Sequence, residues 1–179
     1  MALGVDYVGQ DCSMARALEL VGERWTLLIV RDSLFGVRRF SDFQAHLDMS
    51  KAVLTGRLAG LVDAGLLERR PHGGRDEYAP TAALEGLWPV VFALNQWGGT
   101  QVPSPGGARR EFLHANCGTL LSGAGICPSC AVFPGPRDVS MRPGPGIGKT
   151  VRPNAVSKAL RSPRRLLEPI RGDQRAHDR

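Results

Sequence analysis

Residues 38–78 constrain the fold of this chain most strongly, because their apolar positions recur with helical spacing twice before a glycine turn. Phe40, Phe43 and Leu47 lie three and four residues apart, which predicts the apolar face of a first helix. Ser41 is expected to cap this helix and Ser50 to cap the next, since a serine hydroxyl accepts a hydrogen bond from a free backbone N–H. Two helices separated by so short a break predict a helix-turn-helix unit.

The second helix of this unit has an apolar stripe on one side and very small residues on the other. Gly65 is expected to end it in a left-handed conformation. Gly56 and Gly60, on the side opposite the stripe, each cost about 1 kcal/mol relative to alanine. They either permit close approach to the major groove of DNA or mark a surface that tolerates small residues, and the sequence leaves both readings open. The stripe is formed by Leu54, Leu58, Leu61 and Val62.

A two-stranded ribbon is predicted after the second helix. Residues 66–70 and 75–79 are the expected strands, and 71–74 the turn, because its glycines accept positive φ. Arg75 would lie at the tip, where an arginine can enter a narrow minor groove. The order of these elements predicts a winged helix-turn-helix, a mainly α fold with a small β-wing.

Motifs across residues 12–98 resemble the HxlR-type transcriptional regulators, which are winged-helix relatives of the MarR group. The resemblance implies a bacterial, homodimeric, DNA-binding regulator that senses redox stress or a small molecule. Pro80 and Leu84 depart from the family pattern just before the last core helix. The similarity is carried by Cys12-x-x-Ala15-Arg16-Ala17-Leu18, Gly22-x-x-Trp25-Thr26-Leu27-Leu28-Ile29, Arg38-Arg39-Phe40-Ser41, Lys51-x-Val53-Leu54-Thr55-x-Arg57-Leu58, Ala64-Gly65-Leu66, Arg69, Tyr78-x-x-Thr81, Pro89-Val90 and Trp97-Gly98.

The expected DNA contacts combine this resemblance with the predicted helices. Few of the side chains are long enough to read base edges, so DNA shape is expected to contribute to specificity. A symmetric dimer would place two recognition helices about 34 Å apart, which predicts an inverted-repeat operator. Repression is the simplest mode, because a small dimer can occlude a promoter. The predicted contacts are Ser50, Lys51, Thr55 and Arg57 at or beside the major groove, Arg75 at the wing, and Arg38 and Arg39 on the phosphate backbone.

Flanking helices are expected to complete the core and pair two copies of the chain. Thr81 should cap a helix that runs to about Trp97 with a broad apolar face. Pro89 would kink this helix unless it restarts there. This face and a first helix beginning at Cys12 are the predicted dimer interface. Alternatively, the wide face binds a different protein partner.

Cys12 is expected at the N-terminus of the first helix. The helix dipole and Arg16, one turn further on, should lower the pKa of its thiol. In some HxlR-type regulators the cysteine at this position is a redox switch, and the resemblance extends that role to Cys12. The alternative is a small buried hydrophobe.

A second cluster, formed by His114, Cys117, Cys127 and Cys130, falls within 17 residues. Two pairs with two residues between their members suit one tetrahedral structural Zn²⁺ with one nitrogen and three sulfur ligands. Ala131 counts against a regular zinc knuckle, because glycine commonly follows the last cysteine. A redox dithiol, a vestigial site, or a small metal- or thiol-dependent protein built on the cluster are the alternatives. No constellation of catalytic residues accompanies the cysteines, so no enzyme activity is expected.

The basic charge of the chain is concentrated in its last quarter. Residues 1–133 carry a net charge of −1 and residues 134–179 a net charge of +7, so the overall +6 does not itself indicate DNA binding. Proline, glycine and arginine dominate the tail, which predicts disorder with a brief helix over 155–161, and its charge could add non-specific DNA affinity. The predicted organisation is a winged-helix domain (1–98), a linker (99–110), a Cys/His module (111–133) and a disordered tail (134–179).

No apolar run in the sequence approaches the roughly 18 residues of a membrane span. The N-terminus also lacks the basic and apolar segments of a secretory signal. A cytoplasmic protein without membrane contact is therefore expected.

Overall fold

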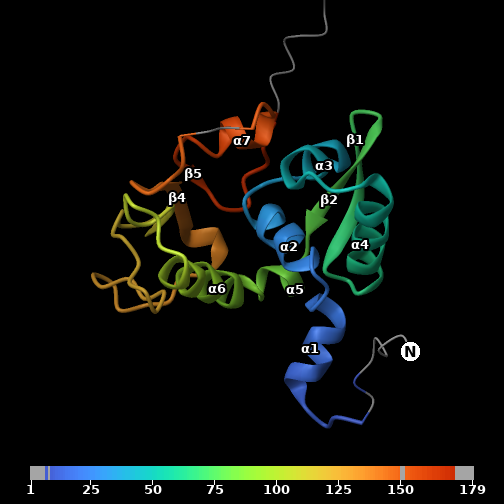
Figure 1. The fold of residues 1–179 in the computed structure, drawn as a ribbon, viewed down its shortest axis with the longest axis horizontal. Coiled ribbons are helices and arrows are strands. Elements are labelled where there is room, and N and C mark those ends of the chain that lie inside the picture. The colour runs from blue at the N-terminus through green and yellow to red at the C-terminus, as the bar shows by residue number, and fades with distance from the viewer. Residues whose placement is uncertain (1–6, 8, 150–151, 172–179) are drawn as a thin grey trace, which may run out of the picture.

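A computed structural model of the chain describes residue 7 and residues 9–149 and 152–171. The winged-helix half, residues 13–101, contains the helices α1 to α6 and a β-hairpin, and the C-terminal half, residues 110–171, contains the strands β3 to β5 and the helix α7. The C-terminal half packs beside α2, α3 and α6, whereas α1 projects away from the body of the molecule (Figure 1). The fold is the predicted winged helix-turn-helix with additional structure after it.

The helix-turn-helix consists of α3 (Phe40–Leu47) and α4 (Lys51–Asp63). The hydroxyl of Ser50 accepts a hydrogen bond from the backbone N–H of Val53 at 3.3 Å, which confirms the predicted cap. Gly65 has φ of 68° just beyond α4, also as predicted. The prediction for Ser41 is wrong: α3 begins after Arg39, without a side-chain cap, so the hydroxyl of Ser41 lies inside the first turn.

The wing is an antiparallel hairpin of β1 (Leu67–His72) and β2 (Arg75–Pro80). His72 pairs with Arg75, so only two residues form the turn. Those residues, Gly73 and Gly74, have φ of 56° and 76°, and two consecutive positive values are what a two-residue hairpin turn of the primed type requires. The strands are thus longer and the turn shorter than predicted.

Four further helices surround this unit: α1 (Ser13–Val21), α2 (Thr26–Leu34), α5 (Ala82–Glu85) and α6 (Trp88–Gln101). The single helix predicted from Thr81 to Trp97 is therefore two helices. Thr81 caps only the first, accepting from the N–H of Leu84. Pro89 lies in the first turn of α6, where its missing N–H leaves no helical hydrogen bond unmade.

Large apolar side chains from most of these helices form one core with the C-terminal half. Phe112 of β3 lies edge-on to Trp88 and Phe92 of α6, with ring centroids 5.3 and 5.5 Å apart. Burying an aromatic side chain contributes about 1.5–3 kcal/mol, so this contact is a main tie between the two halves. The fully buried members with large side chains are Ile29, Leu34, Phe43, Leu54, Leu58, Leu61, Leu67, Leu84, Trp88, Phe92 and Met141.

The C-terminal half contains an antiparallel sheet of β3 (Arg110–His114), β4 (Val139–Pro143) and β5 (Arg164–Arg165). The 3₁₀ turn Pro136–Asp138 precedes β4, and α7 (Ala155–Ala159) lies within the predicted brief helix. The disorder predicted from Pro134 onward is wrong for residues 134–149 and 152–171. These segments contain few apolar residues, yet they are ordered because β4 pairs with β3, about 30 residues earlier in the chain. The composition of the segment itself does not reveal this pairing. Residues 150–151 and 172–179 lie outside the described residues.

The end of this half is hydrogen-bonded to the loop between α2 and α3. The backbone N–H groups of Leu167 and Ile170 donate to the carbonyls of Leu34 and Gly36 at 2.7 and 2.8 Å. Gly36 has φ of 101°, and a Cβ there would collide with the carbonyl oxygen of Glu168. Glycine at position 36 therefore allows the two halves to approach closely.

Within the described residues, no helix combines the length and the apolar character needed to cross a membrane.

Candidate nucleic-acid interface and metal centre

The outward face of α4 is made of short side chains. Ser50 and Thr55 are exposed, as are Gly56 and Gly60 further along the helix, and Lys51 is exposed beside them. A Cβ atom added at either glycine would meet no other atom within 4 Å. Nothing in the chain itself therefore requires glycine at these two positions, and the face is free to approach another surface.

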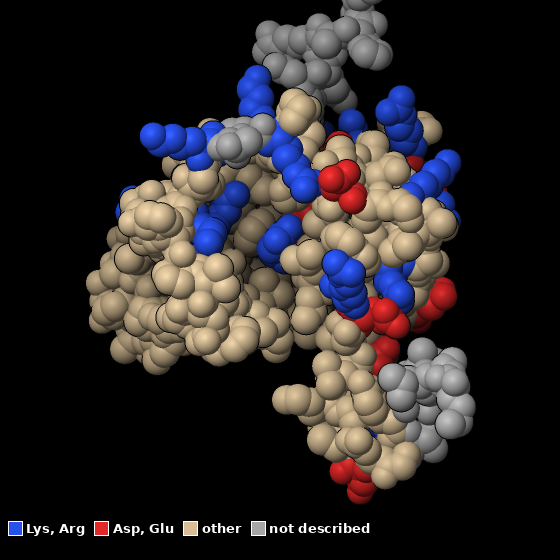
Figure 2. Space-filling view, in the orientation of Figure 1, with Lys and Arg blue, Asp and Glu red and all other residues tan. Residues whose placement is uncertain are grey.

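Basic side chains lie beside this face and on the wing. Lys51 and Arg75 are exposed, and neither forms an ion pair with another residue in the part of the chain that the structure describes. Arg57 pairs with Glu23 at 2.8 Å and Arg39 with Glu77 at 3.4 Å. Figure 2 shows Lys and Arg side chains projecting around the wing. Because ion pairs at the surface contribute about 0–1 kcal/mol, Arg57 can exchange Glu23 for a phosphate at small cost. Arg39 and Glu77 are half-buried.

The prediction that Arg38 contacts the DNA backbone is wrong, because this side chain is buried, with 6% of its surface exposed. Its guanidinium donates to the carbonyls of Ser33, Val37 and Leu167 at 2.6–2.9 Å. Burial lowers the pKa of Arg38 to about 10, and the group remains charged at neutral pH. The side chain ties the α2–α3 loop to the C-terminal half, a role that no local pattern indicates.

Cys12 is the N-terminal cap residue of α1 and is exposed, so the reading as a buried hydrophobe is wrong. The backbone N–H groups of Ala15 and Met14 favour the thiolate and so lower the pKa of the Cys12 thiol, although the side chain makes no capping hydrogen bond. Arg16 is not among the causes. It forms an ion pair with Glu19 at 2.9 Å and donates to backbone carbonyls of the preceding segment.

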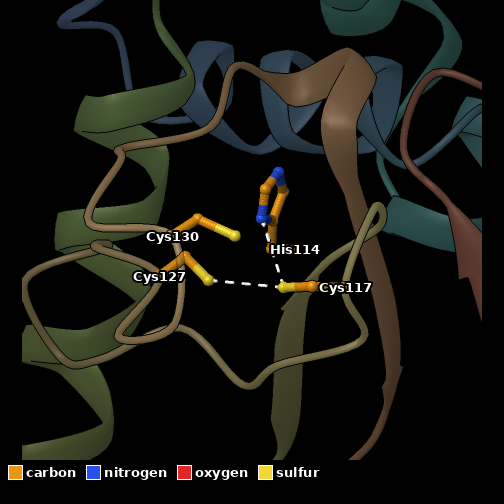
Figure 3. A group of neighbouring side chains, drawn as sticks. All are labelled: His114, Cys117, Cys127 and Cys130. Atoms are coloured by element: carbon orange, nitrogen blue, oxygen red, sulfur yellow. Dashed lines mark hydrogen bonds between the residues drawn. The ribbon is translucent and has the colours of Figure 1, made fainter.

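His114, Cys117, Cys127 and Cys130 converge at the end of β3, as the sequence predicted for a metal site (Figure 3). Their ligand atoms lie within 4.8 Å of one another. The Sγ of Cys117 is 3.4 Å from Nδ1 of His114 and 3.5 Å from Sγ of Cys127. Ligands about 2.3 Å from a tetrahedral Zn²⁺ are separated by a little under 4 Å, so the spacing fits such an ion.

Two tight turns bring the ligands together. Gly118 follows Cys117 with φ of 70°, and its N–H donates to the carbonyl of His114. Ala131 follows Cys130 with φ of 54°, and its N–H donates to the carbonyl of Cys127. The alanine therefore does not prevent the second turn, although it occupies a left-handed conformation that favours glycine.

The thiols of this cluster ionise unequally. Hydrogen bonds from the hydroxyl and the backbone N–H of Thr119 lower the pKa of Cys117 to about 6. Hydrogen bonds to Cys117 and Cys127 raise the pKa of Cys130 to about 11. One thiolate thus forms readily and opposes a second, unless a cation neutralises the charge. A divalent metal ion would neutralise this charge. The three thiols and the imidazole therefore fit Zn²⁺ in their chemistry as well as in their spacing.

A buried polar cluster that no sequence motif indicates lies behind the helix-turn-helix. Asp32 of α2 is fully buried and accepts hydrogen bonds from Arg31 and from Nδ1 of His46, the latter at 2.6 Å. Arg110 of β3 lies close enough for the charge on Arg31 to lower its pKa. Asp32, His46 and Arg110 are far apart in the sequence and share no motif, so only the fold brings them together.

The fold and the exposed face of α4 define a winged helix-turn-helix protein, and comparison with known proteins gives its family. Residues 20–105 match the family model described as HxlR-like helix-turn-helix. The chain is 42% identical over 138 residues to the HTH-type transcriptional regulator Rv3095 of Mycobacterium tuberculosis, which is itself uncharacterized. That match covers 75% of this chain and 87% of the relative.

Two further proteins support the assignment. YvaP of Bacillus subtilis, another HTH-type transcriptional regulator, is 34% identical over 86 residues, covering 46% of this chain and 80% of the relative. The crystal structure of PA1607, a proposed transcription factor, matches with a TM-score of 0.58 and 32% identity over 63% of this chain and 80% of that chain. This chain belongs to the HxlR-like helix-turn-helix family, and it is a DNA-binding transcriptional regulator rather than an enzyme, as the sequence predicted.

Proposed function

We propose that the protein acts as a homodimer, binds an inverted repeat in double-stranded DNA and represses transcription by occluding a promoter. The observation that carries the proposal is the exposed face of α4, which presents small residues, together with the exposed Arg75 at the tip of the wing. A helix with so few protruding side chains can lie close to the groove floor. Specificity then draws on DNA shape as well as on base contacts.

Each of the predicted DNA contacts apart from the buried Arg38 has a role in this proposal. Lys51 and Arg75 approach phosphates and the minor groove from α4 and from the wing tip. Arg39 and Arg57 release Glu77 and Glu23 to bind the phosphate backbone. Ser50 and Thr55 lie at the groove edge, with Ser50 also capping α4. Most such contacts position the protein and do not read bases.

Apolar residues left exposed on α1 and α6 support the homodimer. Leu18 and Leu20 of α1 are 40% and 56% exposed, and Leu94 and Trp97 of α6 are 45% and 62% exposed. Because α1 projects from the body, a second copy can cover both sets at once (Figure 1). Joined by a second copy, these side chains would form an apolar interaction surface.

Fluorescence anisotropy with duplexes from the region upstream of the gene tests the DNA proposal. Wild-type protein is expected to prefer one of these duplexes to a scrambled duplex of the same composition. Gly56→Ala tests whether the glycines permit close approach to DNA or only mark a surface that tolerates small residues. The substitution should stabilise α4 by about 1 kcal/mol in either case. If close approach matters, this variant binds DNA more weakly despite its greater stability. Equal affinity for upstream and scrambled duplexes contradicts the proposal.

Light scattering of the eluate from size-exclusion chromatography tests the assembly. Wild-type protein should elute with the mass of two chains, and Trp97→Glu should elute with the mass of one. Val132→Glu is the matched control, because Val132 is also exposed but lies in the Cys/His segment. A wild-type monomer would instead favour the reading in which this face binds a different protein.

We also propose one structural Zn²⁺ held by His114, Cys117, Cys127 and Cys130. These residues would fill all four positions around a tetrahedral ion, which would leave no open position for catalysis. Metal analysis of protein purified without chelator should give one zinc per chain. Absence of zinc, with a fold that is unchanged in EDTA, would instead favour the redox dithiol or the vestigial site.

A redox role for Cys12 is a second proposal, supported by its exposure and by its lowered thiol pKa. Mass spectrometry after mild peroxide treatment should find Cys12 oxidised, and Cys12→Ser should make DNA binding insensitive to peroxide. A Cys12 thiol that stays reduced under these conditions refutes the switch.

A further inference from the structure

The junction of the two halves contains a cavity of about 200 Å³ that is lined by positive charge. Arg110, Arg152, Arg161 and His46 line it, and no acidic residue does. Figure 2 shows Lys and Arg side chains in the hollow between the two halves. Such a lining is the usual environment of a carboxylate or phosphate group.

The nearest acidic groups already have partners. The oxygens of Asp32 accept hydrogen bonds from Arg31 and from Nδ1 of His46. Asp48 lies 3.5 Å from Arg152 in an exposed ion pair, which stabilises little. Within the described residues, Arg110 therefore has no ion pair of its own, and Arg152 has only this exposed one.

Arg110 is fixed in a position that faces this cavity. Its guanidinium lies over the ring of Phe35, 5.9 Å from the centroid, and donates to the carbonyl of Leu160. Burial is the largest cause of a lowered pKa of about 10 for Arg110, and the charges on Arg31 and Arg161 lower it further. An anion in the cavity would relieve the repulsion among these arginines.

We propose that this cavity binds a small anionic metabolite that bears a phosphate or carboxylate group, and that the anion is the effector of the regulator. The volume corresponds to about seven water molecules, which suits a small phosphate ester or a short dicarboxylate. The effector role rests on the proposed DNA-binding function, whereas the binding site does not.

The cavity is placed to influence the DNA-reading helix. Arg152 donates to the carbonyl of His46 at 3.3 Å, and Asn154 donates to the carbonyl of Ala45 at 3.2 Å. Both carbonyls belong to the last turn of α3, and only residues 48–50 separate α3 from α4. An anion held between α3 and α7 therefore changes DNA affinity if it prefers one position of α3 over another.

Calorimetric titration of the full-length protein without DNA tests the site. The probes are inorganic phosphate, phenyl phosphate and succinate, with ionic strength held constant by KCl. Saturable binding of at least one probe, with one site per chain, is expected. If none of the three binds in a saturable manner, the site is refuted.

Three variants test whether binding occurs in this cavity. Ser157→Asp places a carboxylate in the cavity, at the third residue of α7, and should weaken binding by about tenfold or more. Arg152→Gln should weaken it several-fold. Arg109→Gln, which removes an arginine that donates to the carbonyl of Val102 outside the cavity, should leave it unchanged. An unchanged Ser157→Asp, or an equal loss in Arg109→Gln, overturns the assignment.

Anisotropy with the preferred duplex then separates the two proposals. The probe that binds should shift the DNA affinity of wild-type protein and have no effect on Ser157→Asp. A probe that binds without changing DNA affinity refutes the effector role. Anion binding by a protein that prefers no duplex refutes the DNA proposal and leaves the site intact. If Ser157→Asp weakens DNA binding with no probe present, the cavity receives DNA phosphate, which overturns the small-anion assignment.

Discussion

In the winged-helix half, regular helices and a hairpin bury large apolar side chains such as Leu54, Leu58 and Trp88. The C-terminal half has short strands, one short helix and long turns, and it gathers three cysteines and a histidine at one point. The first half is stabilised by packing that is spread over many residues. The second half also buries apolar side chains, such as Met141 and Leu160, and the zinc proposed above would add a cross-link to this packing. Variants in the winged-helix half and variants in the C-terminal half should therefore differ in which part of the molecule loses its structure.

The largest expected effect is loss of the proposed structural zinc. Cys127→Ser removes a fully buried ligand, and it should abolish zinc binding and open the C-terminal half. Structural zinc contributes on the order of 10 kcal/mol in small metal-folded domains. Limited proteolysis should cut first within residues 115–138, while the helical circular dichroism signal largely persists. Cys12→Ser is the control. Equal resistance of all three proteins to protease would show that no ion stabilises this half.

Phe112→Ala should have the next largest effect, because this ring joins the two halves. Truncation of a buried phenylalanine costs about 3–5 kcal/mol, and both halves should lose stability together. Urea unfolding followed by circular dichroism and by tryptophan fluorescence measures this. The control, Leu120→Ala, truncates a residue that is 46% exposed and should change little. Two separate transitions in wild-type protein would contradict a shared core.

Ser50→Ala should act on the winged-helix half alone. Loss of the N-terminal cap of α4 is expected to lower the free energy of unfolding by about 1 kcal/mol. Ser41→Ala is the matched control, since Ser41 lies within the first turn of α3 and caps nothing. Thermal unfolding of both variants checks the difference. Equal losses would argue against the observed helix boundaries.

The smallest expected effect concerns the second turn of the Cys/His cluster. Ala131→Gly relieves a left-handed conformation worth about 1–2 kcal/mol, but it also adds freedom to the unfolded chain, so a net gain of about 0.5 kcal/mol is expected. The midpoint of zinc release against a chelator should shift toward a higher chelator concentration. Ala124→Gly, at an exposed position outside the two turns, should not produce this shift.

The same contrast explains which predictions succeeded. The helices α3 and α4, the cap at Ser50 and the wing follow from the spacing of nearby residues, and the metal cluster follows from the pairing of its ligands. These signals are local, so the sequence alone contains them. The break between α5 and α6 was anticipated only as a possible restart at Pro89.

Contacts between distant residues explain the errors. The order of the C-terminal half depends on the pairing of β3 with β4 and on Phe112 against α6, and neither leaves a trace in composition. The burial of Arg38 depends on a carbonyl 129 residues away, at Leu167. From the sequence alone, an arginine that contacts DNA cannot be distinguished from an arginine that is buried in the fold. The arginine-lined cavity also arises from segments that are adjacent only in the fold.

The most direct test of the account compares the two halves in DNA binding at several salt concentrations. One double variant, Lys51→Gln with Arg75→Gln, removes two charges from α4 and the wing. The other, Lys149→Gln with Lys158→Gln, removes two exposed charges from the C-terminal half. The first should lose affinity for the preferred duplex and lower the salt slope by about 2, whereas the second should keep most of both. The opposite result would place DNA binding in the C-terminal half and contradict the account.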